Sequence, residues 1–168
     1  MSDGTLLLAV RHNCWANEQL LKFCAALPPE QLAWTVPGTY GSIHATLQHI
    51  VRAEEGYLYA LNRDELPPRG RVASPEQGLV PVDELRDRAR TSAERTERYL
   101  ASGDDTSRRI PRPNGEAYTA RVAAAQFIHH GSDHRAHVGT VLGAHGVTAP
   151  EIAVWDYALA IGELVESR

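Results

Sequence analysis

The sequence predicts an all-α protein: a four-helix bundle with one short additional element that is helical, irregular or a hairpin. Apolar residues recur every three or four positions in four long segments, and clusters of proline and glycine separate these segments. The chain has 168 residues, of which 43% are apolar and 23% charged. This size and composition are typical of one globular domain, so we expect residues 1–168 to form a single domain.

The first helix is expected over residues 5–27. Val10 and Leu21 belong to an apolar stripe that repeats at helical spacing along this segment. Pro28–Pro29 ends the helix, because the second proline forces the first out of the helical region. A loop is expected over residues 30–40.

The second helix is expected to begin after Ser42, a residue type that caps helix N-termini, and to end near Asn62. His49 falls in the middle of this helix, where its side chain can face another helix. Residues 64–78 contain several prolines and glycines and are expected to form a long loop.

The third helix is expected over residues 82–100, where one apolar stripe is flanked by charged faces. Residues 101–118 carry no helical pattern. Asn114–Gly115 lies within them, and this dipeptide suits the tight turn of a small hairpin.

The fourth helix is expected over residues 119–145, with Gly146 as its C-terminal cap. A fifth helix is expected over residues 150–165. Pro150 would stand in its first turn, where proline is tolerated, and Glu151 would favour the same turn electrostatically.

Composition excludes several partners. A formal charge of -4, without a basic patch, argues against nucleic acid. The sequence contains no apolar run of the roughly 18 residues needed to cross a bilayer, so no membrane partner is expected.

Cys14 and Cys24 would lie about 15 Å apart on one helix, too far for a disulfide. Unpaired cysteines and the lack of a signal-peptide pattern point to the cytoplasm, and the expected partner is a small-molecule substrate.

The segment 127–142 concentrates four of the eight histidines, namely His129, His130, His134 and His137. On a helix, His130 and His134 are one turn apart on one face. His49 can join them if the second and fourth helices face each other. Three imidazoles suit zinc, nickel, copper or iron, and three protein ligands leave the open position typical of a catalytic metal.

The remaining histidines receive separate interpretations. His137 follows His130 by two turns and has three alternatives: a hydrogen-bond partner of a ligand, a fourth ligand that closes the site, or a substrate contact. His129 is rotated away towards a neighbouring helix or solvent. Structural roles are expected for the others, which are His12, His44 and His145.

Other chemistry finds little support in the sequence. It contains no glycine-rich phosphate loop, no Cys-x-x-Cys motif and no Gly-x-Ser-x-Gly motif. Glu54 and Glu55 do not stand three or four residues from His49, and the fourth helix has no Glu-x-x-His motif. A ferritin-like di-iron site is therefore rejected.

Three segments carry a resemblance to a known family. They are W-A-N-E-Q-L-L at 15–21, G-T-Y-G-S-I-H-A-T-L-Q-H-I at 38–50 and H-H-G-S-D-H-R at 129–135. Together they resemble the DinB/YfiT-like family, and they occur in the family's order over most of the chain. One departure is that Arg135 is followed by Ala-His, where the family commonly continues Gly-Gln.

The resemblance implies a four-helix bundle, frequent homodimers and a divalent metal held by His49, His130 and His134. Characterised members include thiol S-transferases that use bacillithiol or mycothiol, and a mycothiol-dependent maleylpyruvate isomerase. We therefore expect an enzyme that transfers a low-molecular-weight thiol to an electrophile, with His137 as a catalytic residue. Zinc or nickel is the expected metal, with manganese or iron as alternatives. A metal-dependent hydrolase and a non-catalytic, metal-stabilised bundle are the alternative functions.

Overall fold

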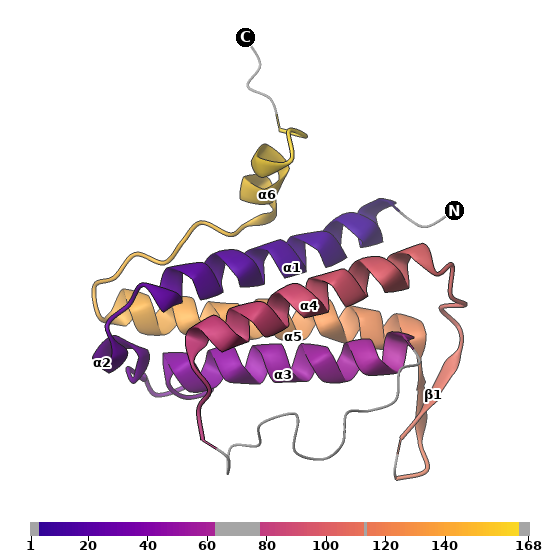
Figure 1. The fold of residues 1–168 in the computed structure, drawn as a ribbon, viewed down its shortest axis with the longest axis horizontal. Coiled ribbons are helices and arrows are strands. Elements are labelled where there is room, and N and C mark those ends of the chain that lie inside the picture. The colour runs from indigo at the N-terminus through magenta and orange to yellow at the C-terminus, as the bar shows by residue number, and fades with distance from the viewer. Residues whose placement is uncertain (1–3, 63–77, 113, 165–168) are drawn as a thin grey trace.

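The structure is a computed structural model that describes residues 4–62, 78–112 and 114–164. Four long helices form its body: α1 (Gly4–Ala25), α3 (Ile43–Asn62), α4 (Val82–Ala101) and α5 (Ala120–Ala144). Figure 1 shows them lying roughly along one direction. The predicted all-α bundle is confirmed, and each of these helices lies within a few residues of its predicted bounds.

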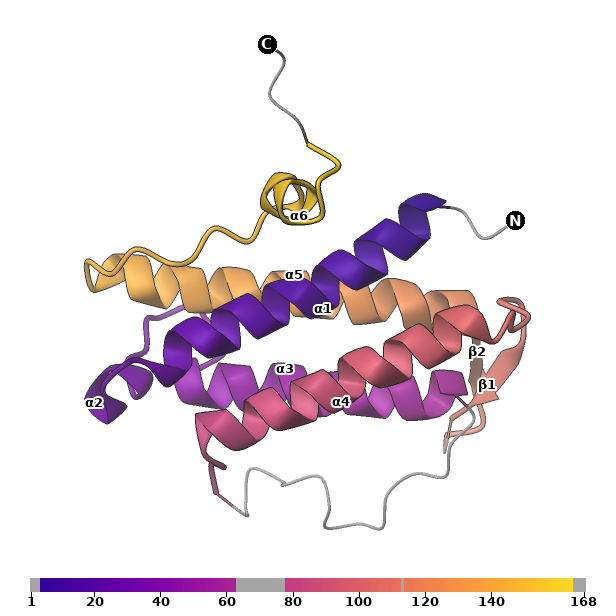
Figure 2. The same ribbon diagram turned by 45° about the horizontal axis from the view of Figure 1, so that its top comes forward.

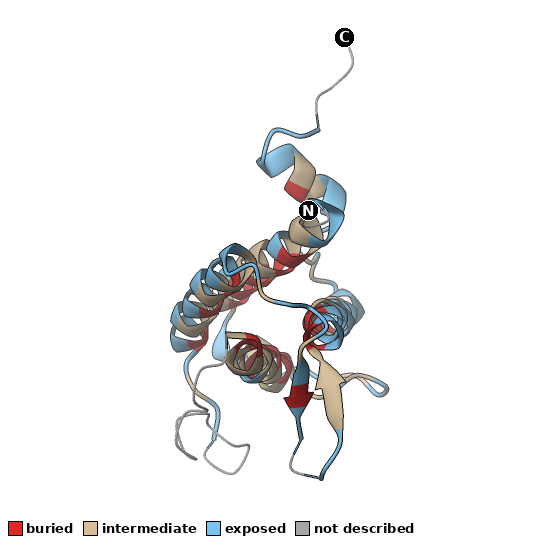
Figure 3. Ribbon diagram, turned by 90° about the vertical axis from the view of Figure 1, so that its right-hand side faces the viewer, coloured by how far each residue is buried: buried red, intermediate tan, exposed pale blue. Residues whose placement is uncertain are grey.

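The order of the helices in space determines which residues can meet. Helix α3 packs against both α4 and α5, and α1 also packs against both of them. Consequently α1 lies diagonally across from α3, as the turned view in Figure 2 shows. In the end view of Figure 3, buried residues lie on the inner sides of the helices. The pairing of α3 with α5 brings the two histidine-bearing helices side by side.

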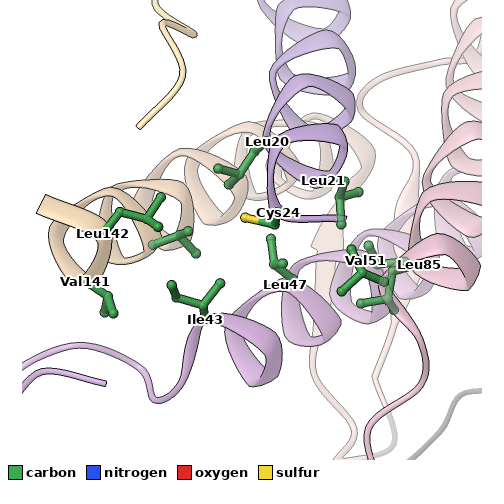
Figure 4. Close-up of a cluster of buried hydrophobic side chains, with 11 residues drawn as sticks. Leu20, Leu21, Cys24, Ile43, Leu47, Val51, Leu85, Val141 and Leu142 are labelled. Atoms are coloured by element: carbon green, nitrogen blue, oxygen red, sulfur yellow. The ribbon is translucent and has the colours of Figure 1, made fainter. Parts of the chain in front are cut away.

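Two apolar clusters fill the bundle. The first joins Leu20 and Leu21 of α1 to Leu47 of α3 and Leu142 of α5, all at most 2% exposed. Figure 4 shows these side chains converging between the helices. The second cluster lies nearer the hairpin and includes Phe127, which is 1% exposed. Burial of these side chains holds α3 against α5 along most of their length.

Two helix ends follow the predicted capping residues. Ser42 precedes α3, and its Oγ accepts a hydrogen bond of 3.1 Å from the backbone N–H of Ala45. At the end of α5, Gly146 adopts φ 75°, which glycine reaches without the penalty a Cβ would impose. The backbone N–H of Val147 then donates to the carbonyl oxygen of Leu142 at 3.0 Å.

The short elements are a hairpin and a helical turn. Strands β1 (Arg109–Pro111) and β2 (Ala117–Thr119) pair antiparallel, so the hairpin interpretation of this region is confirmed. The turn contains Gly115 at φ 84°. Helix α2 (Pro29–Leu32) is a single turn that begins at the second proline of Pro28–Pro29 and extends into the segment expected to be a loop.

The predicted fifth helix was wrong in its extent. Helix α6 spans only Val154–Ala160, and Pro150 and Glu151 precede it in non-helical conformation. The backbone N–H of Ala153 donates to the Asp156 carboxylate at 2.7 Å, which sets the start of the helix. Gly162, at φ 76°, ends it.

The expected loop at 64–78 falls almost entirely outside the described residues. Within the described part of the chain, no helix combines the length and apolar character needed to span a membrane.

Candidate metal centre

The three histidines that the sequence singled out meet between α3 and α5. His49 comes from α3, while His130 and His134 come from successive turns of α5. The Nε2 atoms of His49 and His130 lie 3.0 Å apart, and one ring nitrogen from each of the three residues lies within 4.8 Å of the other two. His130 and His134 are buried, whereas His49 is partly exposed.

The donor chemistry of this group fits a divalent cation. Burial, together with the neighbouring histidines, lowers the pKa of His130 to about 4. Burial is also the main cause that lowers the pKa values of His49 and His134. All three rings are therefore neutral at pH 7 and have lone pairs to offer. Two nitrogens bound to one tetrahedral zinc would be about 3.3 Å apart, close to the observed separation.

Aromatic rings enclose the three histidines. Tyr40 stacks on His49 with ring centroids 4.1 Å apart and an interplanar angle of 17°, and it meets the His134 ring edge-on at 5.0 Å. Tyr57 approaches His130 edge-on at 5.8 Å. These contacts restrict the orientations of the imidazoles. The sequence did not predict this role of Tyr40. Tyr40 precedes α3, so no helical spacing relates it to His49.

His137 contacts one of the three histidines and lies outside their group. Its Nδ1 is 3.3 Å from the Nδ1 of His134, which leaves Nε2 of His134 for a metal. Asp133, His134 and His137 make a second group of potential ligands, in which Asp133 is exposed. Among the three alternatives for His137, this geometry matches the hydrogen-bond partner of a ligand.

The other four histidines stay away from the centre, as predicted. His129 is exposed to solvent. A ring nitrogen of His12, His44 and His145 lies 2.8, 2.6 and 2.9 Å, respectively, from a backbone carbonyl oxygen. The contacts of His12 and His44 join distant segments, whereas His145 bonds back to its own helix and stacks on Trp34 with ring centroids 4.4 Å apart.

Comparison with known proteins supplies the family. The model of the DinB family matches residues 1–163. The chain belongs to the DinB family. Its helical bundle and its histidine cluster agree with that membership, since metal binding is a general property of the family. No curated protein matches the chain.

Next to the three histidines, this DinB-family chain buries a polar network that joins α1, α3 and α5. Asn13 and Asn17 of α1 donate to Oε1 of Glu54 at 2.7 and 2.6 Å. Nη1 of Arg135 donates to the side-chain oxygens of the same two asparagines, at 2.7 Å each. Each amide thus turns its N–H groups to the carboxylate and its oxygen to the guanidinium. Because Arg135 directly follows His134, the network fixes the helix that carries two of the three histidines.

Glu54 and Glu55 both engage groups other than the three histidines. Burial raises the pKa of Glu54 to about 7, although Asn13, Asn17 and Arg135 oppose this rise. Glu55 forms a bidentate ion pair with Arg88 of α4, in which Nε and Nη2 of Arg88 donate to the two carboxylate oxygens at 2.8 and 2.6 Å.

The two cysteines are unsuited to nucleophilic catalysis. Burial raises the pKa of Cys14 and of Cys24 to about 12, so both remain thiols at neutral pH. Neither forms a disulfide. A thiol reaction in this protein therefore needs a thiol from a second molecule.

Gly131 allows the network to approach α5 closely, and replacing it should destabilise the protein. A Cβ at this position would collide with Oδ1 of Asn13 and lie 2.7 Å from Nη1 of Arg135. We expect Gly131→Ala to lower the free energy of unfolding by about 1–3 kcal/mol. Gly143→Ala on the same helix is the control: it meets no atom within 4 Å and should raise stability by roughly 0.5–1 kcal/mol. Urea unfolding of both variants measures the difference, and equal effects would contradict this assignment.

Proposed function

We propose that this chain is a divalent-metal-dependent enzyme that transfers a low-molecular-weight thiol to an electrophile. The observation that carries the proposal is the group of three neutral imidazoles, His49, His130 and His134, beside a cavity of about 250 Å³ that His49 helps to line. Three protein ligands leave a coordination position for a small molecule. The cavity supplies the space from which such a molecule could approach.

In this proposal His49, His130 and His134 hold the metal, with zinc or nickel expected and manganese or iron as alternatives. When bound, the metal supplies a Lewis acid that lowers the pKa of a thiol or a water molecule. Because Cys14 and Cys24 both stay protonated at neutral pH, they support a thiol that arrives as a cosubstrate.

The chain's own residues orient and enclose the reacting groups. With a proton on Nδ1, His134 can donate to Nδ1 of His137 and keep the lone pair of its Nε2 for the metal. Tyr40 covers one face of His49 and so limits the access of water on that side. A direct catalytic role of His137 stays a prediction.

A homodimer is part of the proposal. Helix α6 exposes large apolar side chains, with Trp155 72% and Leu159 63% exposed. A second copy of the chain could cover this surface, which would otherwise face water.

The proposed reaction can be tested with metal-free protein reloaded with one metal at a time. Each form is incubated with small thiols, bacillithiol and mycothiol included, and with 1-chloro-2,4-dinitrobenzene. We expect the thiol to form a carbon–sulfur bond and release chloride faster than the uncatalysed rate only when the metal-loaded protein is present. A His129→Ala variant, altered at an exposed position of α5, should react normally.

Two other outcomes would contradict thiol transfer. Metal-dependent hydrolysis of esters or amides without any thiol would favour the hydrolase alternative. A stably bound metal whose removal lowers the melting temperature, with no reaction on any substrate, would favour the structural alternative.

A further inference from the structure

A cavity of about 250 Å³ lies beside the candidate metal centre, between α3 and the segments that precede α3 and α4. The described residues of its walls offer an aromatic ring, apolar groups, an amide and one permanent positive charge. The lining residues are Tyr40, Ala45, Gln48, His49, Arg52 and Leu79.

One wall of the cavity is held in place by hydrogen bonds to α3. Nε2 of Gln48 donates to the carbonyl oxygen of Gly78 at 3.1 Å, and the backbone N–H of Val80 donates to Oε1 of Gln48 at 2.8 Å. Nε2 of His44 lies 2.6 Å from the carbonyl oxygen of Val80. These bonds fix Leu79 at the cavity and engage both ends of the Gln48 amide. Gln48 therefore has a structural role in the cavity wall. Among the described lining residues, Arg52 is the charged group that can bind a ligand.

The positive charge of Arg52 is not neutralised by the neighbouring acids. Glu54 points into the buried network, and Glu55 is paired with Arg88 at 2.6 Å. Within residues 4–62, 78–112 and 114–164, the guanidinium of Arg52 has no hydrogen bond or ion pair. A half-buried cation without a partner beside a cavity is a binding group for an anion.

Shape and chemistry favour a carboxylate as this anion. The planar guanidinium donates two parallel N–H bonds, which match the two oxygens of a carboxylate. Tyr40 and Leu79 offer apolar surface to the remainder of the same molecule. His49 lies one helical turn before Arg52, so a ligand held by Arg52 has its other end near the metal centre.

We propose that this cavity binds the carboxylate of a small organic acid through Arg52. The inference rests on the proposed function in that the acid would be one of the two cosubstrates. The carboxylate could belong to the thiol or to the electrophile, and both sources share the same recognition chemistry.

Benzoate is a suitable probe because it joins a carboxylate to an apolar ring, and benzamide is its neutral counterpart. Ligand-observed NMR should show saturable benzoate binding that is at least about tenfold tighter than benzamide binding. Arg52→Gln should weaken benzoate binding by about 10- to 100-fold, and Arg52→Lys, which keeps the charge, by less. Arg90→Gln removes the same charge at an exposed position of α4 and should leave the affinity unchanged. Absent benzoate binding, or equal binding by native protein and Arg52→Gln, would overturn the proposal.

A second arm separates this inference from the metal-dependent function. His130 does not line the cavity, so we expect a His130→Ala variant to bind benzoate normally after it has lost metal affinity. Arg52→Gln should keep the native metal content. Benzoate binding that disappears with the metal would show direct coordination and would overturn the role of Arg52.

The transfer assay identifies the source of the carboxylate. Matched thiols and matched electrophiles, with and without a carboxylate, are compared in native and Arg52→Gln protein. Arg52→Gln should raise KM about tenfold or more for the acid-bearing partner alone, with little change in kcat. Equal KM values for every acid-bearing substrate in the two proteins would contradict the assignment.

Discussion

Replacing His49 by alanine is expected to abolish tight binding of a divalent metal while the helical bundle remains folded. His49 is the one member of the three-histidine group that α3 contributes, and its Nε2 lies 3.0 Å from that of His130. Removing a hydrogen-bond partner of a ligand already costs about 10- to 100-fold in metal affinity, and removing a ligand should cost more than about 100-fold. The partly exposed position of His49 makes a large loss of stability unexpected.

Metal analysis after dialysis, together with far-ultraviolet circular dichroism, would measure both effects. His129→Ala is the matched control, because His129 is an exposed histidine on the same helix as two of the proposed ligands. His137→Ala should give an intermediate loss of about 10- to 100-fold, as expected for a partner of His134. Native metal content in His49→Ala would show that the three histidines do not share an ion.

Replacing Arg135 by methionine is expected to cause the largest loss of stability. At pH 8 the variant would leave Glu54 as a buried anion without its positive neighbour, and would leave the oxygens of Asn13 and Asn17 without a donor. Protonation of Glu54 limits the electrostatic part of this cost to about 1–2 kcal/mol at pH 8, and the two unpaired amide oxygens bring the expected total to about 3–5 kcal/mol. For a chain of this size that corresponds to a fall in melting temperature of about 10 °C.

A double-mutant cycle distinguishes this network from general damage to the core. In a Glu54→Gln background no buried anion remains, so Arg135→Met should cost less than about 2 kcal/mol. Arg11→Met is the matched surface control: its ion pair with Glu97 is exposed and should contribute less than about 1 kcal/mol. Equal costs of Arg135→Met in both backgrounds would contradict coupling through Glu54.

The difference in free energy of unfolding between Glu54→Gln and native protein should also depend on pH. The folded-state pKa of Glu54, about 7, lies above the ordinary value of 4.5. The folded state therefore binds the proton more tightly, and this contribution to stability is complete below pH 4.5 and is lost as pH rises through 7. Glu54→Gln cannot ionise, so its stability relative to native protein should rise over this interval by roughly 3 kcal/mol. A difference that does not change with pH would mean that Glu54 does not titrate there.

The helices and their ends could largely be predicted from the sequence, because they depend on residues that are close together in the chain. The cap at Ser42, the turn at Gly146 and the Asn-Gly hairpin each depend on residues a few positions apart. Helix α6 is instructive, because Pro150 and Glu151 suited a helix start that the structure does not use. The Asp156 carboxylate instead accepts the N–H of Ala153, and the helix begins after it.

The candidate site could be predicted only in part, because its residues come from segments that are far apart in the sequence. Spacing alone placed His130 and His134 on one face of one helix. Tyr40 had no pattern to indicate a contact with His49. Arg52 looked like one more charged residue on a helix, and only the structure showed that Glu54 and Glu55 are engaged elsewhere and that Arg52 has no hydrogen bond or ion pair among the described residues.

By itself, the sequence determined the helices, most of their limits and the candidate ligands, since propensity, capping and apolar periodicity act over a few residues. The tertiary structure decided which helices are neighbours. Packing of α3 against α5 brings His49 to His130 and His134 and leaves the Arg52 cavity at the edge of this group. Such contacts depend on the burial of apolar surface between segments about 80 residues apart, which no local pattern encodes.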